Sequence, residues 1–185
     1  MILHPHEVSV EDLQAEHVRS PGVHFSDLLK PILRKMDPKR FGGGEIDPEF
    51  VFAGFVWEEV MSGALARMAR GRRKYLHQME VVFREVILTI DTFDLEKWRV
   101  HEYKFTEMSS RHSILDHRFW HWWVQIKAYC LATGTKEAEL WVYFARGDYK
   151  GKRREAKRWV AEFSERELEE NWMMLENKKK ELGTR

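Results

Sequence analysis

Two neighbouring stretches decide the fold: Ile-Leu-Thr-Ile-Asp-Thr-Phe-Asp at residues 87–94 and Arg-Val-His-Glu-Tyr-Lys-Phe at residues 99–105. The first is rich in β-branched and aromatic residues, and the second alternates charged or polar groups with larger ones, which favours β-strands. Asp91 stands at the polar end of its apolar strand. Glu102 and Lys104 are two residues apart, so they point to one face of theirs. We therefore expect two carboxylates and an ammonium at the exposed edge of a strand pair.

Residues 79–83 have the same strand-like composition, so the three stretches together predict two or three strands in a meander. Upstream, Asp47-Pro48 is a helix-start signal, and residues 48–70 carry apolar side chains at helical spacing. Downstream, residues 111–133 return to the helical period. Helices therefore flank the strands on both sides along the chain.

The rest of the chain continues the alternation of helix and strand. Residues 140–145 predict a short buried strand, and residues 147–158 predict a basic loop that runs into a short helix. Ser164 and Glu167 form a capping box at the start of a last helix. We expect an α/β fold with a restriction-endonuclease-like core, in which a mixed central sheet of about four strands is flanked by helices.

Composition limits the class of protein. The chain has 185 residues, 43% of them hydrophobic and 33% charged, with a formal net charge of +1. This predicts one domain, with an N-terminal helical segment at 1–47, a catalytic core at about 48–146 and a C-terminal basic loop and helix at 147–185. The longest apolar run, residues 50–57, is too short to span a membrane, and a secretory signal is not evident at the start, so we expect a cytoplasmic protein.

Carboxylates and an ammonium gathered at one strand edge suit a hard divalent cation. Mg²⁺ and Mn²⁺ prefer oxygen ligands. Such an ion polarises a phosphodiester and makes hydroxide available near neutral pH, while a neighbouring lysine can orient the attacking water. The plainer interpretation is a solvated Glu102–Lys104 ion pair worth about 0–1 kcal/mol, with Asp91 as a turn residue.

Two further pairs, each spaced four residues apart on a predicted helix, favour the chemical interpretation. Gly54 and Glu58 share one helical face, where the glycine lets another backbone approach and the glutamate can reach a metal ion. Gln125 and Tyr129 share a polar stripe on the later helix. Such a stripe is also common on an ordinary amphipathic helix surface.

Taken in order, these pieces resemble a known family. The order is Gly-x-x-x-Glu, an apolar strand that ends in Ile-Asp, Glu-x-Lys, and Gln-x-x-x-Tyr. This resembles the PD-(D/E)xK nuclease superfamily, in its RecB-like and lambda-exonuclease-like branch, which includes phage recombination nucleases. The resemblance covers about half of the chain, from residue 50 to residue 145.

The resemblance implies a role for each matching residue. Asp91 and Glu102 would be direct ligands of one or two Mg²⁺ or Mn²⁺ ions, with the Tyr103 carbonyl oxygen as a further ligand. Lys104 would position the attacking water. Glu58 would bind the metal directly or through water.

The later helix matches the family pattern, and two other features of the sequence depart from it. Gln125 and Tyr129 would steady the site and contact DNA phosphate. Many RecB-like members carry a metal-binding histidine in the first motif, and Trp57-Glu58 stands there instead, as in the lambda-exonuclease form. Some relatives hold an iron–sulfur cluster on four cysteines, but this chain has only Cys130, so no iron–sulfur cluster is expected.

Two basic clusters are candidates for DNA contact. One follows the first long helix and the other follows the last predicted strand of the core; each is equally well explained as solvated surface. Their members are Arg72, Arg73, Lys74, Lys150, Lys152, Arg153 and Arg154.

The resemblance therefore implies a divalent-metal-dependent deoxyribonuclease, an exonuclease of recombination, repair or phage DNA processing in a bacterial or phage-infected cell. Its partner would be DNA, with no membrane, and a homo-oligomer or a recombination partner protein is possible. Two alternatives stay open: a non-catalytic DNA-binding or assembly protein that keeps the nuclease fold, and another Mg²⁺ enzyme that acts on nucleotides. The latter is disfavoured because the chain has no Walker-type phosphate loop.

Overall fold

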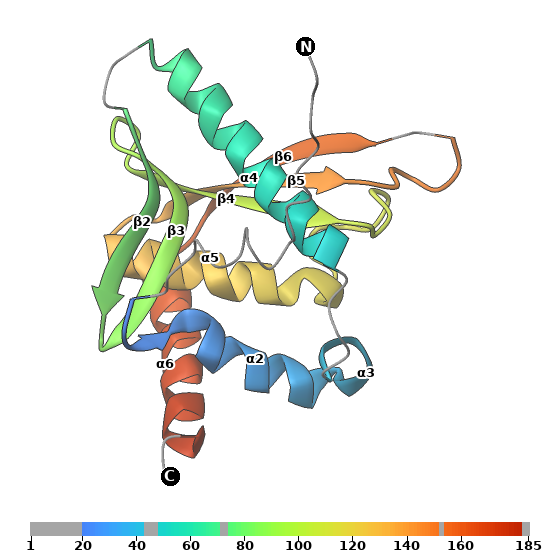
Figure 1. Cartoon of the computed structure of the whole chain (residues 1–185). Coiled ribbons are helices and arrows are strands. Elements are labelled where there is room, and N and C mark those ends of the chain that lie inside the picture. Colours follow the sequence, from blue (N-terminus) through green and yellow to red (C-terminus); the bar gives the residue numbers. More distant parts are fainter. Residues whose placement is uncertain (1–19, 43–47, 71–73, 152–153, 183–185) are drawn as a thin grey trace, which may run out of the picture.

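The computed structural model describes residues 20–42, 48–70, 74–151 and 154–182, and its elements alternate between helix and strand (Figure 1). In chain order they are β1 (Val23–His24), α2 (Phe25–Met36), α3 (Pro38–Phe41), α4 (Pro48–Met68), β2 (Tyr75–Phe83), β3 (Val86–Asp94), β4 (Arg99–Thr106), the 3₁₀ helix η1 (His117–Phe119), α5 (Trp120–Thr133), β5 (Glu137–Phe144), β6 (Glu155–Glu162) and α6 (Glu165–Leu182).

One mixed sheet joins the strands in the order β1-β3-β4-β5-β6, and β2 pairs with β3. β2, β4 and β6 pair antiparallel with β3, β3 and β5, whereas the short β1 pairs in parallel with β3. β4 and β5 are also parallel and are joined by the crossover helix α5. The mixed α/β fold predicted from the sequence is therefore confirmed, with six strands instead of about four. The additional strands are the two-residue β1 and the eight-residue β6.

β6 corrects the interpretation of residues 147–158 as a basic loop that runs into a short helix. The structure has a strand at Glu155–Glu162, which pairs along its whole length with β5. Its side chains alternate between half-buried and exposed, which is the period of a strand at the edge of a sheet. The sheet therefore extends beyond the predicted core boundary at residue 146.

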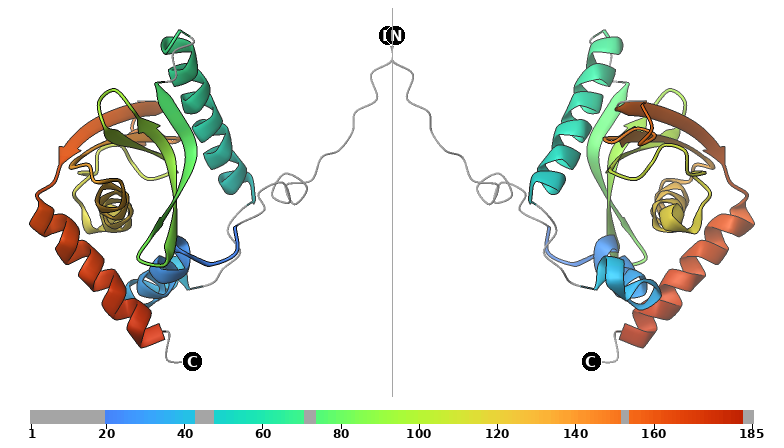
Figure 2. Two further views of the ribbon diagram at one scale, coloured as in Figure 1. Left: turned by 90° about the vertical axis from the view of Figure 1, so that its left-hand side faces the viewer. Right: turned by 90° about the vertical axis from the view of Figure 1, so that its right-hand side faces the viewer.

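The sheet curves around α5, and α6 lies beyond that helix, while α4 covers the other face of the sheet (Figure 2). Buried aliphatic and aromatic side chains from β3, β4, β5, α5 and α6 form the main core. A smaller cluster under α4 contains Met61, Leu65 and Tyr103. Within α5, Trp122 is buried, whereas its neighbour Trp123 is half-buried.

Helix ends follow the signals in the sequence. The Ser164 backbone N–H donates to Glu167 Oε2 at 2.9 Å and the Glu167 N–H donates to Ser164 Oγ at 3.3 Å, which is the predicted capping box of α6. Gly134 ends α5 in the left-handed conformation with φ of 70°, as its C-cap role requires. α5 itself begins at Trp120 instead of near residue 111, because η1 and irregular turns precede it. None of the described helices is both long and apolar enough to cross a membrane.

Candidate active site

β3 and β4 form a fork, and the candidate acidic residues lie where it opens. The two strands pair at only three positions, the last of which is Thr92 with His101. Beyond this point β3 continues along β2, and β4 continues along β5. Asp91 and Glu102 are the first residues past the last pair, one on each branch. The backbone itself therefore brings together two carboxylates that are eleven residues apart in the sequence.

Asp91 bridges the fork with its side chain. The Tyr103 backbone N–H donates to Asp91 Oδ2 at 2.8 Å, so this carboxylate takes the place of the missing strand partner. Asp91 is buried, and burial raises its pKa above the ordinary range, although Lys104 and the Tyr103 N–H oppose the rise.

Glu102 and Lys104 point to the same face of β4 and form an ion pair. Glu102 is fully buried, and apart from this ion pair neither of its carboxylate oxygens has a hydrogen-bond partner among the described residues. Burial, followed by the negative charge of Asp91, raises the pKa of Glu102 to about 8. Burial alone would lower the pKa of the Lys104 ammonium, but the charges of Glu102 and Asp91 outweigh burial and raise it. The fork therefore holds two carboxylic acids whose pKa values are raised and one lysine that keeps its proton.

α4 adds Glu58 from the opposite side of the fork. Gln78 Nε2, on β2, donates to Glu58 Oε2 at 3.4 Å. Burial raises the pKa of Glu58 to about 7, with the charge of Asp91 as the second cause and Lys104 opposing it. Glu58, Asp91 and Lys104 therefore interact electrostatically across the fork.

α5 supplies a hydrogen-bonded chain that ends on the lysine. Lys104 Nζ donates to Gln125 Oε1 at 3.1 Å, and Gln125 Nε2 donates to Tyr129 Oη at 2.7 Å. Tyr129 is buried, and burial followed by the charge of Glu102 raises its pKa well above the ordinary value, so the phenol keeps its proton. The polar stripe predicted from the sequence faces the fork and not the solvent.

The structure thus brings together all six side chains that the sequence singled out as catalytic, from four different elements. Among the described residues, however, no three His, Cys, Asp or Glu side chains are grouped closely enough to hold a metal ion by themselves. Gly54 was expected to let another backbone approach its helix, and the structure contradicts this role as well. A Cβ atom built there would meet nothing within 4 Å, so no described backbone packs against this glycine.

The residues predicted to contact DNA are only partly described. Arg72, Arg73, Lys152 and Arg153 lie outside the described residues. Lys74 is paired with Glu96 at 2.8 Å beyond the end of α4. Lys150 and Arg154 are exposed and lie in the connection between β5 and β6, with Arg154 directly before the first residue of β6.

Sequence reasoning missed Gln78, which lies on β2 across from Asp91, between the pairs His77–Thr92 and Met79–Ile90. Its backbone has φ of 49°, a left-handed conformation that is uncommon for a residue other than glycine. Nothing in the sequence around position 78 indicates this conformation. Unusual backbone of this kind is often found at functional sites, and here it accompanies the hydrogen bond to Glu58.

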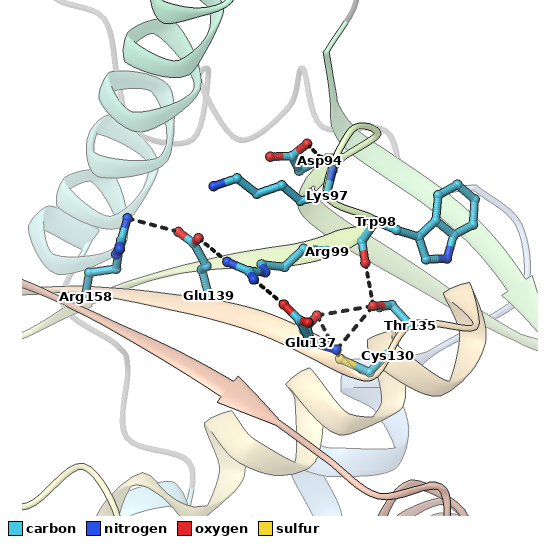
Figure 3. A network of polar contacts seen from close by, with 9 residues as sticks. All are labelled: Asp94, Lys97, Trp98, Arg99, Cys130, Thr135, Glu137, Glu139 and Arg158. Carbon is cyan, nitrogen blue, oxygen red and sulfur yellow. Dashed lines mark hydrogen bonds and ion pairs between the residues drawn. The ribbon is translucent and has the colours of Figure 1, made fainter.

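Sequence reasoning also missed a second polar network, partly buried, at the base of β4 and β5 (Figure 3). Arg99 forms ion pairs with Glu137 and, at 2.7 Å, with Glu139, and Arg158 lies 3.8 Å from Glu139. Glu139 is only 2% exposed and also accepts the Trp141 indole N–H at 3.1 Å. Because Arg99 begins the strand that carries Glu102, the network fixes β4 against β5 beside the fork.

Comparisons with known proteins show the fold. No protein-family model matches the chain, and no curated protein sequence matches it. Among solved structures, a phage-related exonuclease from Haemophilus somnus 129PT is 12% identical over 94% of this chain and 86% of that one, with a TM-score of 0.52. The crystal structure of SSO0001 is 15% identical over 91% of this chain and 82% of that one, with a TM-score of 0.48. The chain therefore has the mixed α/β fold of a phage-related exonuclease.

Proposed function

We propose that this chain is a divalent-metal-dependent deoxyribonuclease of the PD-(D/E)xK superfamily, and that it acts as an exonuclease on DNA in phage processing, recombination or repair. The observation that carries the proposal is the fork, which holds Asp91 and Glu102 on its two branches with Lys104 beside them. The fold shared with a phage-related exonuclease supports it independently.

The residues at the fork fit Mg²⁺ or Mn²⁺. Two buried carboxylates with raised pKa values and an oxygen of Glu102 without a hydrogen-bond partner are costly unless a cation neutralises them. Mg²⁺ usually keeps several waters and takes only one or two protein carboxylates, together with substrate phosphate. Asp91, Glu102 and the Tyr103 carbonyl oxygen would hold one ion, and Glu58 would join through a bound water or hold a second. When bound, the metal polarises the phosphodiester and lowers the pKa of water.

The other residues would position the reactants. The Lys104 ammonium would hold the attacking water in line with the scissile phosphate and stabilise the charge that develops there. Gln125 would fix the direction of the Lys104 side chain through the hydrogen bond that it accepts. Tyr129 would hold the Gln125 amide in the required orientation, because its hydroxyl accepts from Nε2.

DNA would be held by basic side chains around the fork. Lys74, Lys150 and Arg154 are the described candidates, and Arg72, Arg73, Lys152 and Arg153 would extend the two clusters. Contacts with phosphates release counterions, so affinity should fall steeply with salt concentration.

Cleavage of end-labelled DNA tests the proposal. Purified protein should degrade linear DNA with Mg²⁺ or Mn²⁺ and not with a chelator, and a covalently closed circle should survive if the enzyme needs an end. Asp91→Ala, Glu102→Ala and Lys104→Ala should each abolish degradation, whereas Glu96→Ala, which removes an exposed carboxylate near the β3–β4 turn, should not. DNA binding with no cleavage by the wild type in either metal would instead support a non-catalytic DNA-binding protein.

A further inference from the structure

The outer face of α4 is apolar, although this helix already buries its inner face. On the inner face Met61 and Leu65 pack with Tyr103 in the smaller core cluster. Figure 2 shows α4 at the edge of the molecule, and on its outer face Val56 and Val60 are 43% and 52% exposed. A helix at the surface of a single chain normally turns charged and polar side chains outwards. Apolar residues on both faces of α4 therefore indicate that a partner covers the outer one.

The outer residues of α4 form one stripe whose two halves differ in size and charge. Spacings of three and four residues place them on one side of the helix. The half nearer the helix start is bulky and acidic, and the half nearer its end is small and basic. In chain order the stripe contains Val56, Glu59, Val60, Gly63, Ala66 and Arg67. The two halves complement each other when a second copy of the helix lies on the first in the reverse direction.

We propose that this face joins two copies of the chain, with their α4 helices antiparallel around a two-fold axis that passes beside Gly63. A contact of this kind uses the same patch on both copies. Glycine has no side chain, so the two helices approach most closely there. The dimer goes beyond the proposed nuclease chemistry and does not depend on it. Glu58 reaches Gln78 from the inner side of α4, so the contact leaves the fork uncovered.

The position of the axis fixes which residues meet. Glu59 and Arg67 stand four residues before and after Gly63, so Glu59 of each copy faces the partner's Arg67. Val60 and Ala66 stand three residues before and after it, so Val60 covers the partner's Ala66. The Arg67 side chain already reaches back along the stripe, because its Nη1 lies 3.3 Å from the position that a Cβ atom at Gly63 would take. The guanidinium is therefore within reach of a helix that crosses at this glycine.

A second copy suits this face better than DNA or an unrelated protein does. Glu59 stands in the middle of the stripe, where its carboxylate would repel the phosphates of DNA. An unrelated protein would have to supply both a small basic half and a bulky acidic half, whereas a reversed copy supplies both. The contact consists of one pair of helices and is smaller than the interface of an obligate dimer, so we expect a dissociation constant in the micromolar range.

Sedimentation velocity of the full chain at low salt, without metal or DNA, tests the proposal. The wild type should change from one chain to two as its concentration rises from about 1 to about 200 µM. Val60→Asp places a carboxylate of each copy in the apolar part of the contact and should weaken the dimer at least about 10-fold. The matched control Val82→Asp makes the same change on β2, where the side chain is 72% exposed, and should leave the dimer unchanged.

Exchange of charges tests the two-fold pairing directly. Glu59→Arg brings two arginines together at each contact, and Arg67→Glu brings two glutamates together. Each variant alone should therefore stay monomeric over the same range of concentration. An equimolar mixture of the two variants should dimerise, because every contact between them again joins an arginine to a glutamate. Dimerisation of the mixture would also show that both variants are folded.

Several results would overturn this dimer. A wild type that stays monomeric at the highest concentration, or that forms a trimer or a larger ring, contradicts it. A mixture of Glu59→Arg and Arg67→Glu that stays monomeric contradicts the pairing across the axis. Equal weakening by Val60→Asp and Val82→Asp would show that the contact does not lie on α4. None of these measurements involves cleavage, so the dimer and the nuclease proposal can fail separately.

Discussion

The variant Glu102→Gln should unfold less readily than the wild type at neutral and alkaline pH when a chelator is present. Glu102 is fully buried at the fork with Asp91 nearby, and among the residues that the structure describes its counter-charge is Lys104 alone. Glutamine keeps the shape of the side chain and removes the acid. The variant therefore loses the proposed metal ligand and gains stability, a trade-off that is common where an active site holds unfavourable charges.

The magnitude follows from the pKa. Burial, and then the charge of Asp91, raises the pKa of Glu102 from 4.5 to about 8. The folded protein therefore keeps a proton that the unfolded chain releases, and the free energy of unfolding falls as pH rises through this window. At about 1.4 kcal/mol for each pH unit, the wild type loses on the order of 3 kcal/mol between pH 4.5 and pH 7 through this group. The glutamine variant loses none of it and keeps the slope from Asp91 and Glu58, since burial raises the pKa of Asp91 and raises that of Glu58 to about 7.

Urea unfolding followed by tryptophan fluorescence, from pH 5 to pH 8 in EDTA, measures the effect. Glu96→Gln is the control, because Glu96 is exposed in its ion pair with Lys74 and should leave the pH slope unchanged. Adding Mg²⁺ at pH 8 should stabilise the wild type and not the Glu102→Gln protein. A wild-type free energy of unfolding that is constant from pH 5 to pH 8, or a Glu102→Gln slope as steep as that of the wild type, would refute the reasoning.

Three other variants test separate parts of the structure. Lys104→Met should lower the rate of Mn²⁺-dependent DNA cleavage by at least about 100-fold in a gel assay while the protein stays folded. A cleavage rate within twofold of the wild type would show that Lys104 does not take part in the reaction. Gly54→Ala should raise the free energy of unfolding, measured in urea, by about 0.5–1 kcal/mol. A Cβ atom at this position meets nothing within 4 Å, and glycine is unfavourable inside a helix. A loss of stability would mean that this face of α4 is more crowded than the structure shows. Arg99→Met should cost about 3 kcal/mol, because it leaves the buried Glu139 carboxylate with the Trp141 indole N–H and with Arg158 at 3.8 Å. The double variant with Glu139→Leu should recover most of that loss, and equal stability of the single and double variants would show that Arg99 and Glu139 are not coupled.

Local sequence signals predicted much of the fold. Helical spacing found α4, and strand composition found β2, β3 and β4. β6 was missed because charged residues, Glu155 and Lys157, occupy the first two of the alternate positions that are half-buried. Lys157 is half-buried there: its ammonium donates to the Ser110 carbonyl at 2.8 Å and lies 5.7 Å from the Phe144 ring. A side chain that buries its aliphatic part and satisfies its charge locally cannot be recognised without knowing its partners.

The residues of the candidate site were predicted, whereas their arrangement was not. Spacing alone indicated that Glu102 and Lys104 share a face, and it paired Gln125 with Tyr129. The fork depends on where β3 stops pairing with β4, and the sequence of one strand alone does not determine which residues of another strand it pairs with. For the same reason Gln78 was not predicted, since its role comes from lying opposite Asp91.

Manganese binding tests the central claim most directly. Electron paramagnetic resonance of free Mn²⁺, titrated into chelator-treated protein with single-stranded DNA present, reports how much of the ion is bound. We expect the wild type to bind Mn²⁺ and Asp91→Asn and Glu102→Gln each to weaken binding at least 10-fold, because each loses one of two carboxylate ligands. Binding of equal strength in all three proteins, or none in the wild type, would contradict a metal site at the fork.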